Sequence, residues 1–389
     1  MHILLTNDDG PPSTNSSPYI LSLVRTLQSH GHIVSVCIPH TQRSWIGKAH
    51  IVGQSIKPTY YRPPPPSSAS DPANVSVESN DQGTTSTHPL PQHADEEEWI
   101  LVDSTPASCI QIGLYHYFEE RGPIDLVISG PNYGRNTTAV FALSSGTLGG
   151  ALEAAVCGVK SIALSYAFFD RNHDPSVIAA ASRSSVKVIE HLAKTWEKGV
   201  QVYTVNTPLL EGVEKTKVMW THMLQNQWES GSCFTEIQVP ENEDADPSEA
   251  EAEIRRAESS SGGKKPNLTG KEEEESNGKQ SHVRYTHKHF KWSPRFKDVY
   301  DSVEKSSPGN DGWAVKEGYI SVTPLKANFM HVGGFEASGI PRIELHASMA
   351  NPDYDGIFCC PQLSRDGLVS VAAVPIGNLL GLRKLMGGG

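Results

Sequence analysis

The chain has 389 residues, of which 37 % are hydrophobic, and it carries a formal net charge of −11. This apolar content is enough for a sizeable core in one or two domains, which excludes a wholly disordered chain. The negative charge argues against sequence-independent binding of a nucleic-acid polymer, because such binding depends on neutralising phosphates with basic side chains. Any site for an anionic substrate is therefore expected to be local and to be helped by a bound cation.

The composition favours a reduced, cytoplasmic protein. The first residues have the pattern of a core strand and a turn, and a secretory signal is not expected. No uncharged apolar run reaches the roughly 18 residues that a membrane-spanning helix needs, so no membrane association is expected. The six cysteines form no C-x-x-C pair and no spacing typical of zinc sites or disulfide frameworks.

Predicted strands and helices alternate along the chain. Apolar runs of strand length are separated by segments with helical spacing of their apolar residues. Near-continuous Val, Ile and Leu runs of this kind are typical of parallel strands covered on both faces, so we predict an α/β fold with a doubly wound, mostly parallel sheet. The predicted strands are 2–6, 32–39, 99–102, 124–129, 160–166, 200–205 and 318–325, and the predicted helices are about 18–30, 105–119, 145–157 and 176–197.

Two segments interrupt this alternation. Residues 62–98 are rich in Pro, Ser, Thr, Asn and acidic residues, and residues 240–282 are a run of Glu, Ser, Lys and Gly. Neither has enough large apolar side chains to order itself, so we predict solvated, low-complexity insertions. The basic and aromatic stretch 282–298 could pack on the fold or contact a phosphate, and packing is the simpler interpretation. Residues 328–389 carry no motif and form a C-terminal region of unclear role.

Polar residues follow three of the predicted strands. They are the segments 6–10 (TNDDG), 41–44 (TQRS) and 130–136 (GPNYGRN). Ligands of parallel sheets bind beyond the carboxyl ends of the strands, and carboxylate, hydroxyl and amide oxygens suit Mg²⁺, Mn²⁺ or Ca²⁺. Asp8-Asp9 could instead form a turn, since Asp before Gly is common there, but two adjacent carboxylates after a core strand are costly without a cation. Ser44 alone would be an ordinary loop serine.

The segment 144–155 (SSGTLGGALEAA) allows two interpretations. A hydroxyl-Gly-hydroxyl turn that opens a helix presents backbone N–H groups and the positive end of the helix dipole to an anion, as in a phosphate site. It is equally a simple helix cap followed by close packing through Gly149 and Gly150. No dinucleotide-binding or P-loop glycine motif is present, and no motif gives a catalytic place to a histidine.

Six motifs follow one another in one order. They are ILLTNDDG (3–10), QRS (42–44), STPASC (104–109), DLVISGPNYGRN (125–136), SSGTLGGALEA (144–154) and EGYISVTPL (317–325). Together they resemble the motifs of the SurE family of metal-dependent 5'-nucleotidases and phosphatases, especially its fungal acid-phosphatase-like branch. The resemblance implies a Rossmann-like core, a homodimer or larger homo-oligomer, and hydrolysis of phosphate monoesters, typically nucleoside monophosphates. The SurE-like domain would span 1–327, interrupted by the two insertions.

The resemblance also implies the site. It implies that Asp8, Asp9 and Asn132 are catalytic. The same three residues, together with Ser44, would be the ligands of a divalent metal ion, Mg²⁺ or Mn²⁺. The residues implied for substrate phosphate are Asn136, Ser145, Gly146 and Thr147.

The sequence also departs from the family pattern. Bacterial members usually continue with a His-Ala-Pro-Gly-like run after Asp-Asp-Gly, where this chain has PPSTNSSPYI, and Trp45 replaces a small residue after Ser44. These departures keep open a catalytically inactive nucleotide-binding protein. A receiver-like regulatory module is a further alternative, because receivers also carry paired acids after their first strand. Only Asp103 could then serve as the phosphoacceptor at the end of the third strand.

Overall fold

The computed structural model describes most of the chain. The described residues are 1–66, 71–91, 94–169, 173–237 and 288–328, together with the short strands β13 (Gln362–Leu363) and β14 (Val369–Ser370). The chain divides into two units, Met1–Phe329 and Met330–Gly389. In the second unit, β13 and β14 pair antiparallel. The first unit contains the main sheet and the candidate site.

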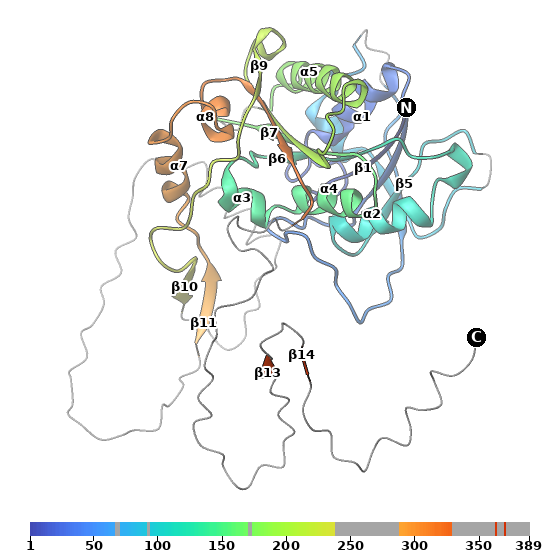
Figure 1. Cartoon of the computed structure of the whole chain (residues 1–389). Helices are drawn as coiled ribbons and strands as arrows, with labels where there is room; N and C mark the ends of the chain where they lie inside the picture. Colours follow the sequence, from blue (N-terminus) through green and yellow to red (C-terminus); the bar gives the residue numbers. More distant parts are fainter. Residues whose placement is uncertain are drawn as a thin grey trace, which may run out of the picture. The chain divides into compact units, whose positions relative to one another are not determined.

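One mixed sheet forms the centre of the first unit (Figure 1). Its strands are β1 (His2–Thr6), β2 (Ile33–Pro39), β3 (Thr59–Arg62), β4 (Thr84–Ser86), β5 (Trp99–Val102), β6 (Leu126–Tyr133), β7 (Ser161–Ala167), β8 (Val202–Pro208), β9 (Val218–Trp220) and β12 (Ile320–Leu325). The strand order is β4-β3-β5-β2-β1-β6-β7-β8-β12-β9. The central strands from β5 to β8 are parallel, whereas β3 and β12 are antiparallel to their inner neighbours. The predicted α/β fold with a mostly parallel sheet is confirmed.

The order places a topological switch point between β1 and β6. From β1 the chain builds outward through β2 and β5, and then returns to the other side of β1 to add β6, β7 and β8. Helices that follow the strands on the two sides leave a crevice at the carboxyl ends of β1 and β6. The polar residues that follow these two strands are therefore brought to one place by the winding of the sheet.

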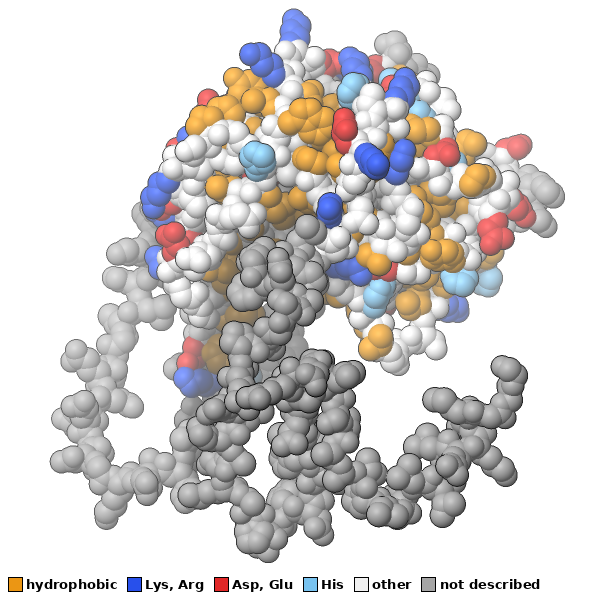
Figure 2. All heavy atoms as spheres, viewed as in Figure 1, with side chains coloured by type: hydrophobic (Ala, Val, Ile, Leu, Met, Phe, Trp, Pro, Cys, Tyr) orange, Lys and Arg blue, Asp and Glu red, His pale blue; other side chains and the backbone are white. Residues whose placement is uncertain are grey.

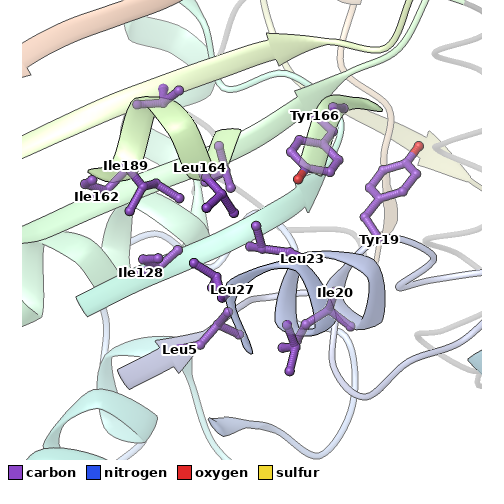
Figure 3. Packing of buried hydrophobic residues seen from close by; sticks show 14 of the residues in the cluster. Leu5, Tyr19, Ile20, Leu23, Leu27, Ile128, Ile162, Leu164, Tyr166 and Ile189 are labelled. Carbon is purple, nitrogen blue, oxygen red and sulfur yellow. The ribbon is translucent and has the colours of Figure 1, made fainter. Parts of the chain in front are cut away.

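Helices cover both faces of the sheet. Helices α1 (Ile20–Ser29) and α5 (Pro175–Lys194) contact each other on one face, and α2 (Pro106–Tyr115) and α4 (Gly146–Val156) contact each other on the opposite face. The side chains of β1 alternate accordingly. Leu5 packs with α1 and α5 (Figure 3), whereas the neighbouring Leu4 packs with α2 and α4. All four predicted helices exist, with ends that differ by a few residues.

Several short elements were not predicted from the sequence. They are the strands β3, β4 and β9, the helices α3 (Thr138–Ser144), α7 (Phe296–Glu304) and α8 (Asp311–Lys316), and the two-stranded ribbon of β10 (Phe234–Ile237) and β11 (His289–Trp292). Each is too short to show a clear periodicity. Among the described residues no single helix is long and apolar enough to cross a membrane. Only α3 and α4 taken together have that length and apolarity, and the two helices are bent by 69° with respect to each other.

The prediction that residues 62–98 cannot order themselves is wrong for much of this segment. Strand β4 pairs with β3, and Ala73 is only 2 % exposed, with its carbonyl accepting a 2.6 Å hydrogen bond from Ser22 of α1. Backbone and side-chain hydrogen bonds to the core order this segment without a large apolar surface. The second predicted insertion, 240–282, lies outside the described residues.

The surface carries charges of both signs. On the face shown in Figure 2, basic and acidic side chains are interspersed with apolar ones over the described residues. Part of the basic and aromatic stretch 282–298 lies outside the described residues, while Phe296 is 7 % exposed and its ring lies 5.7 Å from that of Trp45. The interpretation that this stretch packs on the fold is confirmed for Phe296, whereas Phe290 in the same stretch is 58 % exposed.

Two glycines with positive φ provide a matched test of the central sheet. Gly130 in β6 has φ +132°, and a Cβ there would lie 2.1 Å from the carbonyl oxygen of Leu164 in β7. Gly158 has φ +83° with open space around it. We expect Gly158→Ala to lower the free energy of unfolding by about 1 kcal/mol, and Gly130→Ala to lower it by more than ~3 kcal/mol because the strands must separate. Urea denaturation measures both, and equal losses would contradict the close approach.

Candidate functional site

Two adjacent carboxylates lie at the switch point of the sheet. Asp8 and Asp9 follow β1, and they are only 2 % and 1 % exposed. The preceding Asn7 closes a tight turn, since its side chain accepts from the Gly10 N–H at 3.0 Å and donates to the Gly10 carbonyl at 2.8 Å. Strand β1 lies between β2 and β6, so the turn is fixed on both sides.

Neutral groups from three segments orient the two carboxylates. Thr147 donates its hydroxyl to Oδ1 of Asp8 at 2.6 Å. The backbone N–H of Tyr133 donates to Oδ2 of Asp9 at 2.6 Å, and the Gln42 amide approaches Oδ1 of Asp9 at 3.4 Å. Hydrogen bonds to a carboxylate hold its oxygens in fixed directions, as they do around metal ligands. The acidic pair is thus joined to α4, β6 and the loop after β2.

Helix α4 begins against Asp8. A Cβ on Gly146 would lie 2.8 Å from Cβ and 2.9 Å from Oδ2 of Asp8, so only glycine allows this approach. Ser145 caps the helix, with its Oγ accepting from the Leu148 N–H at 3.1 Å. The N–H groups of Gly146 and Thr147 lie in the first turn, where a helix supplies no partners of its own and its dipole favours an anion. The fully buried Thr147 hydroxyl serves Asp8, and phosphate binding at 145–147 stays a prediction.

The loop that carries Ser44 lies between β1 and α4. The N–H of Arg43 donates to the Asp8 carbonyl at 2.6 Å, and the N–H of Gly47 donates to the Ser144 carbonyl at 2.9 Å. Gly149 of α4 lies so close that a Cβ there would be 2.2 Å from the Gly47 carbonyl oxygen. Ser44 itself is half-buried in this loop, next to the residue that binds the backbone of Asp8.

The two predicted asparagines lie at the end of β6. Asn132 is 9 % exposed and donates its amide nitrogen to the Gly134 carbonyl at 2.8 Å, which directs its amide oxygen elsewhere. Asn136 is 6 % exposed, and its amide nitrogen donates to Ser165 of β7 at 2.9 Å. Its backbone N–H donates to Asn206 of β8 at 2.9 Å. Asn136 is therefore held against β7 and β8.

The donors at this place fit a hard divalent cation. Within the described part of the chain no group of three or more His, Cys, Asp or Glu side chains could hold a metal ion. A cation at Asp8 and Asp9 would therefore need hydroxyl and amide oxygens to complete its shell, which is the predicted set with Ser44 and Asn132. Oxygen ligands alone suit Mg²⁺ or Mn²⁺ and disfavour thiolate-preferring metals. The assignment of these four ligands stays a prediction.

Sequence reasoning missed several residues that shape the site. Gln42 lies in a matched motif without being chosen, and the Tyr133 contact uses backbone, which leaves no signal in the sequence. Asp311 lies about 170 residues beyond the site in α8 and is fully buried. Its carboxylate accepts the N–H of Thr138 at 3.0 Å and that of Leu224 at 2.9 Å. It thereby anchors the start of α3, two residues after Asn136.

Trp45 is held in an aromatic cluster. Its backbone has φ +61°, and its ring contacts those of Phe141, Trp292 and Phe296 at centroid distances of 5.5 to 5.7 Å. Such edge-to-face and tilted contacts stabilise by burial and by ring electrostatics. The bulky residue that departs from the family pattern thus joins the Ser44 loop to β11 and α7.

Glu153 of α4 anchors the Ser44 loop through Lys48. Its carboxylate, in α4, forms a 2.5 Å ion pair with Lys48 and accepts a 2.6 Å hydrogen bond from Gln111. Burial by itself raises the pKa of Glu153, but the hydrogen bonds and charge of Lys48 and the Gln111 amide hold the pKa below its usual value. A carboxylate with a lowered pKa stabilises the fold above its unfolded pKa, and this stability is lost as pH falls through the folded value.

Replacing this carboxylate tests the anchor. We expect Glu153→Gln to lower the free energy of unfolding at pH 7 by about 1–3 kcal/mol, because Lys48 loses its buried partner. The difference from wild type should shrink as the pH falls below the ordinary pKa of glutamate. Glu304→Gln removes the exposed Lys316 pair and should cost about 0.5 kcal/mol or less. Urea denaturation at pH 7 and pH 4 checks this, and a pH-independent loss at Glu153 would contradict it.

Comparisons with known proteins agree with this architecture. Residues 3–230, more than half of the chain, match the family model "Survival protein SurE". The Saccharomyces cerevisiae protein named "Probable tubulin--tyrosine ligase PBY1" is 33 % identical over 348 residues, covering 85 % of this chain and 42 % of that protein. This chain therefore spans less than half of the yeast protein's length. "5'-nucleotidase SurE" of Ruegeria pomeroyi is 30 % identical over 258 residues, covering 64 % of this chain and 78 % of the relative.

A second bacterial relative and a solved structure extend the likeness. "5'-nucleotidase SurE" of Rhodopirellula baltica is 31 % identical over 222 residues, covering 56 % of this chain and 71 % of the relative. The crystal structure of the SurE protein from Aquifex aeolicus superimposes with a TM-score of 0.50 at 21 % identity, covering 85 % of this chain and 95 % of that one. At that identity the structural likeness shows the fold alone. From the family model and the relatives together, this chain belongs to the SurE family.

Proposed function

We propose that this chain is a divalent-metal-dependent phosphomonoesterase of the 5'-nucleotidase and acid phosphatase type. Its substrates would be nucleoside monophosphates or other phosphate monoesters. The observation that carries the proposal is the buried Asp8–Asp9 pair at the switch point, joined by the 2.6 Å Thr147 bond to the first turn of α4. A cation site and an anion site would then lie side by side. The bacterial relatives that match this chain are named 5'-nucleotidases, which are phosphoric monoester hydrolases.

The cation site would consist of oxygen atoms from four residues. Asp8, Asp9, Ser44 and Asn132 would bind Mg²⁺ or Mn²⁺, which when bound supplies positive charge against the phosphate and acidity to a water molecule. Hydrogen bonds from the Thr147 hydroxyl and the Tyr133 N–H fix the orientation of the two carboxylates before a cation binds. Their burial also limits the bulk water that could weaken these interactions.

The phosphate would be held by groups whose remaining hydrogens can be donated. The Ser145 oxygen accepts from Leu148, so its own proton is available to a phosphate oxygen. Asn136 uses one amide hydrogen for Ser165 and carries a second. With the N–H groups of Gly146 and Thr147, these donors would stabilise the negative charge that builds on the non-bridging oxygens.

The strand order does not favour a receiver-like module. A receiver needs its phosphoacceptor beside the acidic pair, but β5, which precedes Asp103, is separated from β1 by β2. The Asp103 side chain is 66 % exposed and pairs with Arg43 at 2.6 Å.

We also propose the cytoplasm as the compartment and a homodimer or larger homo-oligomer as the assembly. Light scattering of the purified protein would measure the mass of this assembly.

The proposed reaction is tested with p-nitrophenyl phosphate and a panel of nucleoside monophosphates. We expect turnover with Mg²⁺ or Mn²⁺, loss of turnover in EDTA, and a fall in kcat of about 10³-fold or more for Asp8→Asn, since it removes a charged ligand. Asp103→Asn, the same change at an exposed aspartate, should leave kcat unaltered. Activity that survives both EDTA and Asp8→Asn would contradict the metal mechanism. A loss of kcat in Asp103→Asn but not in Asp8→Asn would favour a receiver.

Thr147 tests the link between the two halves of the site. Thr147→Val keeps the shape of the buried side chain but removes the donor to Asp8, so we expect about a 10–100-fold loss of kcat or metal affinity. Thr147→Ser keeps the hydroxyl and should retain most of the activity. Steady-state kinetics at several Mn²⁺ concentrations distinguish the two, and equal loss in both variants would point to packing instead of the hydrogen bond.

A further inference from the structure

The turn after Asn136 contains a residue in a strained conformation. Thr138, the first residue of α3, is fully buried and has φ +69°, in the left-handed region that β-branched residues rarely adopt. Its buried hydroxyl has no hydrogen-bond partner within the described part of the chain. Both features destabilise the folded protein. Strain of this kind persists only where other contacts impose it, and here it lies two residues from a proposed phosphate ligand.

A buried carboxylate of α8 holds the backbone of Thr138. Asp311 is fully buried, and its Oδ2 accepts the Thr138 N–H at 3.0 Å. Its Oδ1 accepts the N–H of Leu224 at 2.9 Å and that of Gly312 at 2.7 Å. All three donors are neutral, and no basic side chain of the described residues pairs with this carboxylate. Burial raises the pKa of Asp311, and the backbone hydrogen bonds only oppose this rise. The fold therefore keeps a costly charge at this place.

The first three N–H groups of α3 are bonded within the chain. Besides the Thr138 bond, Ala139 donates to the Leu224 carbonyl at 2.8 Å, and Val140 donates to the side-chain oxygen of Asn226 at 3.0 Å. These are groups that a helix leaves without partners of its own. Figure 1 shows α3 and α8 on the same side of the first unit. The contacts therefore hold the backbone at the start of α3 and do not present it to an anion.

The sheet supports Asn136 from the other side. Its backbone N–H donates to Asn206 of β8 and its amide nitrogen donates to Ser165 of β7, both at 2.9 Å. A single residue separates Asn136 from the anchored Thr138. The direction of the second amide hydrogen of Asn136, which is the one proposed for the phosphate, thus depends on two supports. These are the neighbouring strands and the carboxylate of Asp311.

We propose that Asp311 is a positioning residue for the substrate phosphate. It holds Thr138 in the left-handed conformation and thereby directs the Asn136 amide, although its own carboxylate bonds only backbone N–H groups. This role rests on the proposed phosphatase function and adds a residue to it. A small displacement of a binding group can weaken catalysis about 10²-fold. Loss of the Asp311 charge should therefore weaken phosphate binding and leave the cation site at Asp8 and Asp9 intact.

Calorimetric titration of the Mn²⁺-loaded full chain with inorganic phosphate tests this role, beside steady-state kinetics with p-nitrophenyl phosphate. Asp311→Asn keeps the shape of the side chain. We expect it to raise the phosphate Kd about tenfold and to lower kcat/KM about 10–100-fold, while the Mn²⁺ Kd changes less than about twofold. Asp298 of α7 also accepts a backbone N–H, from Ser230 at 2.9 Å, but it anchors a segment without a site residue. Asp298→Asn should leave all three constants unaltered.

The wild-type chain separates this role from the proposed function. If wild type neither binds phosphate nor hydrolyses the ester, the proposed function fails. If wild type binds phosphate and Asp311→Asn binds it equally well, only the positioning role is overturned. An equal loss in Asp298→Asn, or a loss of Mn²⁺ affinity as large as that of phosphate affinity, overturns it as well.

A double-mutant cycle shows whether Asp311 acts through Asn136. Asn136→Ala alone should raise the phosphate Kd about tenfold, because a donor to the phosphate is lost. Adding Asp311→Asn should then raise it less than about twofold further, since the amide that Asp311 positions is already absent. A merely structural role for Asp311 predicts that the two losses add. Additive losses would overturn the route through Asn136.

Two Thr138 variants measure the strain independently of the stability of Asp311→Asn. Glycine adopts a positive φ readily and alanine does not, so Thr138→Gly should melt about 2–4 °C above Thr138→Ala. At an ordinary helical position the order is the reverse. In the Asp311→Asn background, Thr138→Gly should restore most of the phosphate affinity and Thr138→Ala should restore none. A lower melting temperature for the glycine variant, or equal phosphate affinities of the two double variants, overturns the role of Asp311 in holding this conformation.

Discussion

The burial of two adjacent carboxylates is the constraint on which the centre of this fold depends. Asp8 and Asp9 are almost inaccessible at the end of the central strand, where the dielectric is low and like charges repel. The structure meets this cost with short hydrogen bonds from Thr147 and from the Tyr133 backbone, and with a helix terminus that approaches through Gly146. A bound divalent cation would neutralise the remaining negative charge of the pair. The features that stabilise the pair are therefore also those that the proposed catalysis needs.

The central elements could be predicted because each has a strong local pattern. The run HILLT predicts β1, and the helical spacing after it predicts α1. Since parallel strands place their carboxyl ends at one edge, the sequence also predicted that the polar residues after β1, β2 and β6 would lie together. It could not predict which atoms meet. The Tyr133 N–H that binds Asp9 is backbone, and the choice of Thr147 as the donor to Asp8 depends on the three-dimensional approach of α4.

The periphery of the site escaped prediction for a different reason. Asp311 anchors the segment that carries Asn136, but its partners lie about 170 and 87 residues away along the chain. The Trp45 cluster likewise joins the Ser44 loop to aromatic residues after position 290. The short elements α3, α7 and α8 have too few turns for a clear periodicity, and segment 71–91 is ordered by hydrogen bonds that composition does not reveal. Contacts between distant segments leave no signal in a single sequence.

The buried polar groups proposed to bind metal and phosphate are held in place by the fold itself. At the candidate active site, Asp8, Asp9 and Asn136 are each bonded to other elements, which fixes their directions before any ligand arrives. Preorganised groups favour chemistry, because little rearrangement is needed as charge develops.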